Sequence, residues 1–176
     1  MKLLYDAVFI VLAVLLQTVF SGVLYFPLPI LLCSLLVISM RRGSVNAVVL
    51  ALFCGAVTDF ICGREFATDC ISYPLAAAAG SFLLPSEPMR FLMGDYVFPG
   101  AAAVLTAGVF SVITPLFFGE SWYYLAGNFC DTVLAAATAP GVLALLVISN
   151  DRIARRLELP GLFVRSIKIA IRPAGR

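Results

Sequence analysis

The sequence contains no histidine and little charge. None of its 176 residues is histidine, and only 12% are charged. Without histidine the chain has no Ser-His-Asp triad, no histidine metal site and no histidine proton relay. An average soluble domain is about a quarter charged, so this chain has too little polar surface to cover a fold in water. The composition excludes a soluble enzyme domain, a disordered chain and a nucleic-acid-binding module.

Apolar residues dominate instead, at 62% of the chain. The length fits one domain, and a helix that crosses a bilayer needs about 20 apolar residues. Six segments qualify: Tyr5–Leu24, Tyr25–Met40, Ser44–Cys62, Asp69–Leu84, Tyr96–Phe118 and Tyr123–Ile148. We predict an all-α polytopic membrane protein with six transmembrane helices. Because the second and fourth segments are short, four or five crossings remain possible.

The positive charges indicate an orientation. No Lys or Arg lies deep inside an apolar segment, so we interpret each one as a loop marker. If the N-terminus is inside, eleven of the twelve Lys and Arg residues fall on the inner side and only Arg64 falls outside. Cytoplasmic loops carry the excess of positive charge. This distribution predicts that both termini face the cytoplasm.

The end of the sequence is basic. We divide the chain into a transmembrane bundle, residues 1–150, and a basic cytoplasmic tail, residues 151–176. Anionic lipid attracts such segments by about 1 kcal/mol per basic residue, and binding of a cytoplasmic partner is the alternative. The tail residues expected to face lipid are Arg152, Arg155, Arg156, Arg165 and Lys168.

Two acids lie inside apolar segments, where a carboxylate costs about 2.5–3.5 kcal/mol. Asp59 is near the outer end of its helix, where the helix dipole disfavours an anion and Arg64 could offset that cost. Asp131 lies about 12 Å below the outer end of the last span, and Asn128 shares its face. Gln17 has a similar depth. We expect Gln17, Asp59, Asn128 and Asp131 to converge in the outer half, either as hydrogen bonds between helices or as a contact for a ligand or partner.

Two further patterns are weaker. Both acids follow a glycine at the same spacing, Gly55 with Asp59 and Gly127 with Asp131, as in an inverted repeat, although chance explains two short matches better. Cys62 and Cys70 flank an outer loop and could pair if that side is oxidising. No Cys-x-x-Cys spacing is present, and we expect neither a metal nor a cofactor.

The stretch from Arg41 to Gly80 resembles the rod shape-determining protein MreD family. Its best-marked feature is a helix that ends in Gly-x-x-x-Asp-x-x-x-Gly, which Gly55, Asp59 and Gly63 match. Gln17 in the first span, the prolines that open the second and the six small spans also fit. The loop after the motif lacks the Leu-Gly pair that is common in the family, and the tail is longer and more basic.

The resemblance implies a non-enzymatic scaffold of bacterial cell-wall elongation in the cytoplasmic membrane. It implies a fold similar to the substrate-binding subunits of energy-coupling-factor vitamin transporters. It also implies association with MreC and, through MreC, with actin-like MreB, the glycosyltransferase RodA and a penicillin-binding transpeptidase. The alternative function is a substrate-binding subunit of such a vitamin transporter. A membrane enzyme is a third possibility, without a recognised catalytic spacing to support it.

Overall fold

The computed structural model describes residues 2–24, 28–61, 68–84, 94–117 and 122–157. Over these ranges the chain forms six α-helices and no strand, which confirms the all-α prediction. The helices are α1 (Lys2–Leu24), α2 (Ile30–Arg42), α3 (Ser44–Ile61), α4 (Thr68–Phe82), α5 (Gly94–Phe117) and α6 (Trp122–Arg156).

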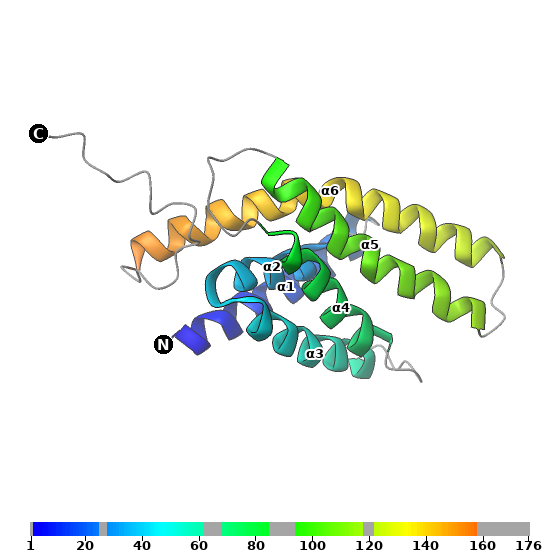
Figure 1. The fold of residues 1–176 in the computed structure, drawn as a ribbon, viewed down its shortest axis with the longest axis horizontal. Helices are drawn as coiled ribbons and strands as arrows, with labels where there is room; N and C mark the ends of the chain where they lie inside the picture. Colours follow the sequence, from blue (N-terminus) through cyan, green and yellow to red (C-terminus); the bar gives the residue numbers. More distant parts are fainter. Residues whose placement is uncertain (1, 25–27, 62–67, 85–93, 118–121, 158–176) are drawn as a thin grey trace, which may run out of the picture.

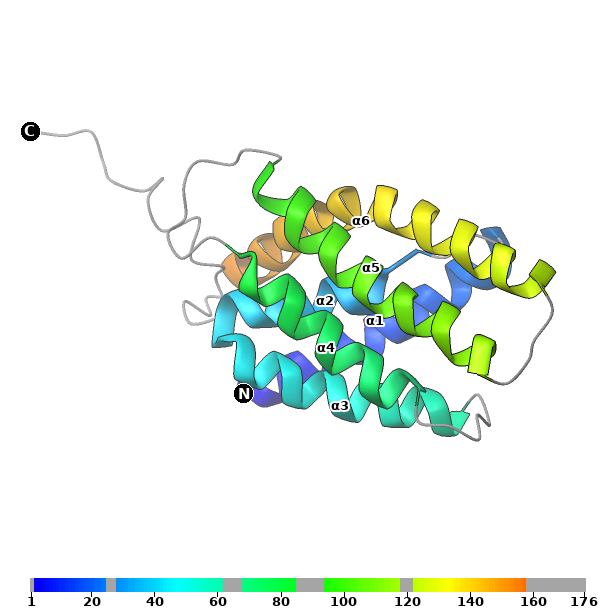
Figure 2. The same ribbon diagram turned by 45° about the vertical axis from the view of Figure 1, so that its right-hand side comes forward.

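Successive helices run in alternating directions along one long axis (Figure 1). The start of α1 and the end of α6 therefore lie at the same end of the molecule. Helices α3 and α4 form one antiparallel pair and α5 and α6 form a longer one, as Figure 2 also shows. Helix α2 lies between these pairs and contacts all five other helices.

Helix α2 is the centre of the fold. All ten residues from Ile30 to Ser39 are buried, which fits a helix that is apolar on every side. The main core joins α2 to Ala76 and Ala77 of α4 and to Leu143 and Val147 of α6. The small alanine side chains let α4 lie close to α2, and the larger side chains of α6 fill the opposite side.

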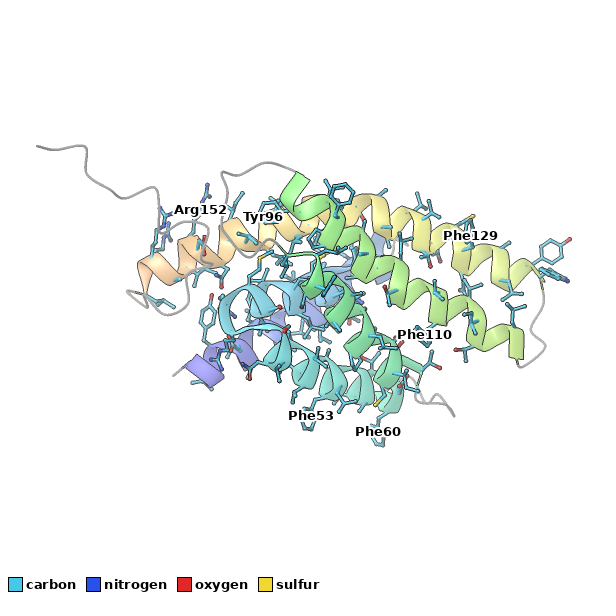
Figure 3. The ribbon with its side chains drawn as sticks, in the orientation of Figure 1. Phe53, Phe60, Tyr96, Phe110, Phe129 and Arg152 are labelled. Atoms are coloured by element: carbon cyan, nitrogen blue, oxygen red, sulfur yellow. The ribbon has the colours of Figure 1, made fainter. Side chains whose placement is uncertain are left out.

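The outer surface of the bundle is strongly apolar. Phe53 and Phe60 point away from the bundle and are 64% and 87% exposed (Figure 3). Phe129 on α6 is also exposed. Two helical stretches, Tyr96–Thr114 and Leu125–Arg156, are long and apolar enough to cross a membrane. Only 28% and 22% of the most apolar 18-residue part of each stretch is buried inside the molecule, so the apolar character there does not come from a packed interior.

The helix boundaries that differ most from the predictions are the start of α2 and the end of α6. Helix α2 begins at Ile30 rather than Tyr25, because Pro29 occupies the capping position with φ −81° and ψ 50°. Helix α6 continues past Ile148, and past the boundary drawn at residue 150, to Arg156. The first three tail arginines therefore lie exposed on the last turns of a helix. Arg165 and Lys168 lie outside the described residues.

One glycine connects α2 to α3. Gly43 is the only residue between the two helices, and its φ of 95° is one that side-chain-bearing residues rarely adopt. Its N–H donates a hydrogen bond of 2.8 Å to the carbonyl of Ser39. Glycine thus lets the chain reverse direction in a single residue.

A buried ion cluster joins α1, α2 and α6 at the end of the molecule where α1 begins. Arg41 Nη2 lies 2.5 Å from Asp6 Oδ1, and Arg42 Nε lies 2.6 Å from Asp6 Oδ2. Arg41 Nη1 also donates to Asn150 Oδ1 at 3.0 Å, and the Tyr5 hydroxyl donates to the same oxygen at 3.1 Å. We call this set, with Asp151, the Asp6–Arg41 cluster.

The interpretation of Arg41 as a loop marker is wrong. Its side chain is 0% exposed, and its guanidinium lies over the rings of Tyr5 and Phe9 at 5.2 and 5.6 Å from their centroids. The charge stays in the interior because a carboxylate, an amide oxygen and two aromatic faces replace its water. The arginine therefore connects helices instead of marking a loop.

This cluster predicts a loss of stability on neutralising Asp6. Asp6→Asn keeps the shape of the side chain but leaves the buried Arg41 without its carboxylate. Removing one partner of a buried ion pair costs about 3–5 kcal/mol, so we expect a clearly lower midpoint of thermal unfolding for the detergent-purified protein. Arg152→Gln removes an exposed charge of α6 and should leave the midpoint nearly unchanged. Equal midpoints for the two variants would contradict the ion pair.

Candidate functional site

Asp59 binds the first turn of the neighbouring helix. Its Oδ1 accepts a hydrogen bond from the backbone N–H of Asp69 at 3.1 Å, and its Oδ2 accepts one from Cys70 at 2.8 Å. The residue is only 6% exposed. The carboxylate satisfies two N–H groups that have no partner within α4, and the positive end of the helix dipole stabilises its charge. The dipole of α4 thus stabilises the charge of Asp59, whereas the dipole of α3 destabilises it.

Gly55 allows this contact to form. It lies one turn before Asp59 on the same face of α3. A Cβ atom placed on Gly55 would lie 2.2 Å from the carbonyl oxygen of Asp69 and 2.7 Å from Cα of Cys70. The backbones of α3 and α4 therefore touch at this point, and any side chain would separate them. Gly63, the third motif residue, lies outside the described residues, as do Arg64 and Cys62 with its proposed pairing to Cys70.

Gln17 has the same role at the start of α2. Its Oε1 accepts a hydrogen bond of 2.9 Å from the backbone N–H of Leu31, the second residue of the helix. Pro29 at the capping position makes no capping hydrogen bond with a side chain. The amide of α1 therefore supplies the acceptor that the local sequence lacks.

A cavity of about 250 Å³ lies beside these two helix starts. Residues of α1, α2, α4, α5 and α6 line it, together with Leu28 and Pro29 just before α2. Its polar lining includes Gln17, Asp69, Asn128 and Asp131. We call it the five-helix cavity.

The structure brings three of the four residues predicted to converge to this cavity. Gln17, Asn128 and Asp131 line it, whereas Asp59 does not and instead holds Asp69, which does. Asn128 Nδ2 donates to the carbonyl of Ser111 at 3.2 Å. Asp131 is exposed and has no hydrogen bond or ion pair to any residue in the described ranges. The carboxylate of Asp59 therefore accepts hydrogen bonds from α4, whereas that of Asp131 has no partner among the described residues.

The two Gly-x-x-x-Asp segments also make different contacts. Gly55 meets backbone, whereas a Cβ atom on Gly127 would meet nothing within 4 Å. Asp59 is buried against α4, and Asp131 faces the cavity. The shared spacing therefore does not correspond to a shared contact.

Sequence reasoning missed Asp6, Asn150 and Asp151, which are at most 2% exposed. The available signal was Asp6, the second residue of the first apolar segment, and the two arginines that follow the second segment. The predicted orientation places all three at the inner side of the membrane, so they could have been paired. Among the described residues no group of three or more His, Cys, Asp or Glu side chains is placed to hold a metal ion.

Comparison with known proteins adds no relative. No family model matches the sequence, and neither the curated proteins nor the solved structures contain a match.

The contact at Gly55 yields a matched pair of substitutions. Gly55→Ala places a methyl group against the backbone of α4, so we expect a marked loss of stability or of folded yield. Gly127→Ala has open space on a helix, where alanine is favoured over glycine by about 0.5–1 kcal/mol. Thermal unfolding of both purified variants measures the difference. A Gly55→Ala protein as stable as Gly127→Ala would show that the helices do not touch there.

Proposed function

We propose that this chain is a six-span scaffold of the bacterial cell-wall elongation complex, of the MreD type, in the cytoplasmic membrane. Both termini face the cytoplasm in this proposal. The protein acts by binding MreC and, through it, MreB, RodA and a penicillin-binding transpeptidase, and it helps maintain cell shape without catalysing a reaction itself.

The surface supports the membrane setting. Large apolar side chains are exposed along the described helices, for example Val8 and Leu15 on α1 and Leu105 on α5. Water would disfavour such a surface, whereas lipid tails match it. The exposed arginines at the end of α6 lie at the end of the bundle where α1 begins. This placement agrees with a cytoplasmic side that carries the positive charge.

The single observation that carries the MreD proposal is the contact made by Gly55 and Asp59. These two residues match the best-marked motif of the family, and here they form one structural unit between α3 and α4. Residues four apart share a face of a helix, and here the glycine and the acid both contact the first turn of α4. The contact gives the spacing of four residues a physical reason.

Depletion in the source bacterium tests this role. We expect depleted cells to become round, and expression of the wild-type chain or of the Gly127→Ala variant to restore rods. Gly55→Ala should restore shape poorly, because it separates α3 from α4. Affinity purification of the tagged protein from crosslinked membranes should recover a single-span protein with a large periplasmic domain. Normal rods after depletion would contradict the proposal.

One observation favours the alternative of a solute-binding transporter subunit. The five-helix cavity is lined by polar residues from several helices, as a site for a small solute requires. The same purification distinguishes the two functions, because recovery of a pair of ATPases without the periplasmic partner would favour transport.

A further inference from the structure

The five-helix cavity is both small and of mixed polarity. Its volume of about 250 Å³ is just below the range of about 300–1,000 Å³ typical of ligand pockets. Apolar side chains of Leu28, Leu32 and Val104 form part of the lining, and Asn128 and Asp131 form another part. A molecule that fits would be small, with an apolar body and one polar end.

The backbone N–H groups at the two helix starts beside the cavity are in use. The N–H groups at the start of α4 bind Asp59, and that of Leu31 binds Gln17. The amide N–H of Asn128 binds the carbonyl of Ser111, which leaves its Oδ1 as an acceptor. The acceptors that remain for an occupant beside α6 include Oδ1 of Asn128 and the carboxylate of Asp131, and an ammonium group offers three donors and no acceptor.

The charge at the cavity also favours a cationic ligand. Asp131 lines it without a partner among the described residues, and the part of the lining that the structure describes contains no Lys or Arg. The positive ends of α2 and α4 are already occupied by Gln17 and by the carboxylate of Asp59. A carboxylate at this depth of a membrane is stabilised by an adjacent cation. Asn128 and Asp131 are three residues apart on α6, so they present two acceptors on one face.

We propose that the five-helix cavity binds a protonated primary amine with a short apolar body, held by Asp131 and Asn128. The inference rests on the membrane embedding proposed above but not on any partner in wall synthesis. The amine has two possible sources, a free solute or the headgroup of phosphatidylethanolamine. Both offer the same ammonium group to the same two side chains.

Three probes with the same phenylethyl body test the charge requirement. Phenethylamine, 2-phenylethanol and 3-phenylpropanoate share an aromatic body and differ in a cationic, neutral or anionic end. We expect the protein in phosphatidylcholine nanodiscs to bind phenethylamine and to bind the other two at least about tenfold more weakly, because charge-assisted hydrogen bonds are the stronger ones. Calorimetric titration of each probe measures the affinities.

Asp131→Asn supplies the decisive variant, because it removes the charge from an exposed side chain and keeps its shape. We expect its affinity for phenethylamine to fall about tenfold or more. Cys130→Ser alters the adjacent residue, which does not line the cavity, and should bind like the wild type. Circular dichroism verifies that both variants are folded.

The outcomes separate the alternatives. Weaker phenethylamine binding in discs that contain phosphatidylethanolamine would support the ammonium site and identify the lipid headgroup as its occupant, whereas unchanged binding would point to a free amine. Equal binding of the three probes, no binding of phenethylamine at millimolar concentration, or an unchanged affinity in Asp131→Asn would overturn the proposal. Because the assay contains only the purified chain, its failure would not affect the test of the wall-elongation role.

Discussion

The fold depends on how two short helices begin inside an apolar bundle. Helices α2 and α4 have 13 and 15 residues, so they span about 20 and 22 Å, less than the ~30 Å of hydrocarbon in the proposed membrane. The first N–H groups of a helix have no partner within it, and each one that is buried without a partner costs free energy. Gln17 and Asp59 meet this need from neighbouring helices. Each side chain satisfies its helix start and also fixes the position of one helix against another.

The cavity is a consequence of the same short helices. In Figure 1 the α5–α6 pair extends beyond the start of α4, so the longer helices continue where the shorter ones are absent. The recess is lined by residues at the starts of α2 and α4, by Gln17, and by the facing sides of α5 and α6. At the other end, the Asp6–Arg41 cluster joins α1 and α6 to α2. Polar contacts thus hold the two ends of the central helix, and apolar packing holds its middle.

Much of this arrangement is predictable because hydropathy and depth are properties of the sequence. The long apolar runs predict the six helices, and counting residues from the outer ends places Gln17, Asn128 and Asp131 at one level. The side chain that will accept hydrogen bonds from the first N–H groups of a helix cannot be read from hydropathy or depth. The hydrogen bonds that Asp59 accepts from the N–H groups of Asp69 and Cys70 were not predicted, because the carboxylate was considered only with its own helix and with Arg64. Arg41 was misread for a similar reason, since a charge at the end of a span gives no sign of the carboxylate that faces it.

Gly55 and Asp59 show how a short motif can specify a site at a distance. The glycine sets how closely α3 approaches α4, and the acid sets which turn of α4 lies opposite. Asp69, whose N–H is bound by Asp59, is itself a wall residue of the five-helix cavity. The motif therefore positions one side of the cavity without entering it. A change in the α3–α4 contact would move that wall relative to Asp131 on α6, so the buried acid and the exposed acid are linked through the first turn of α4.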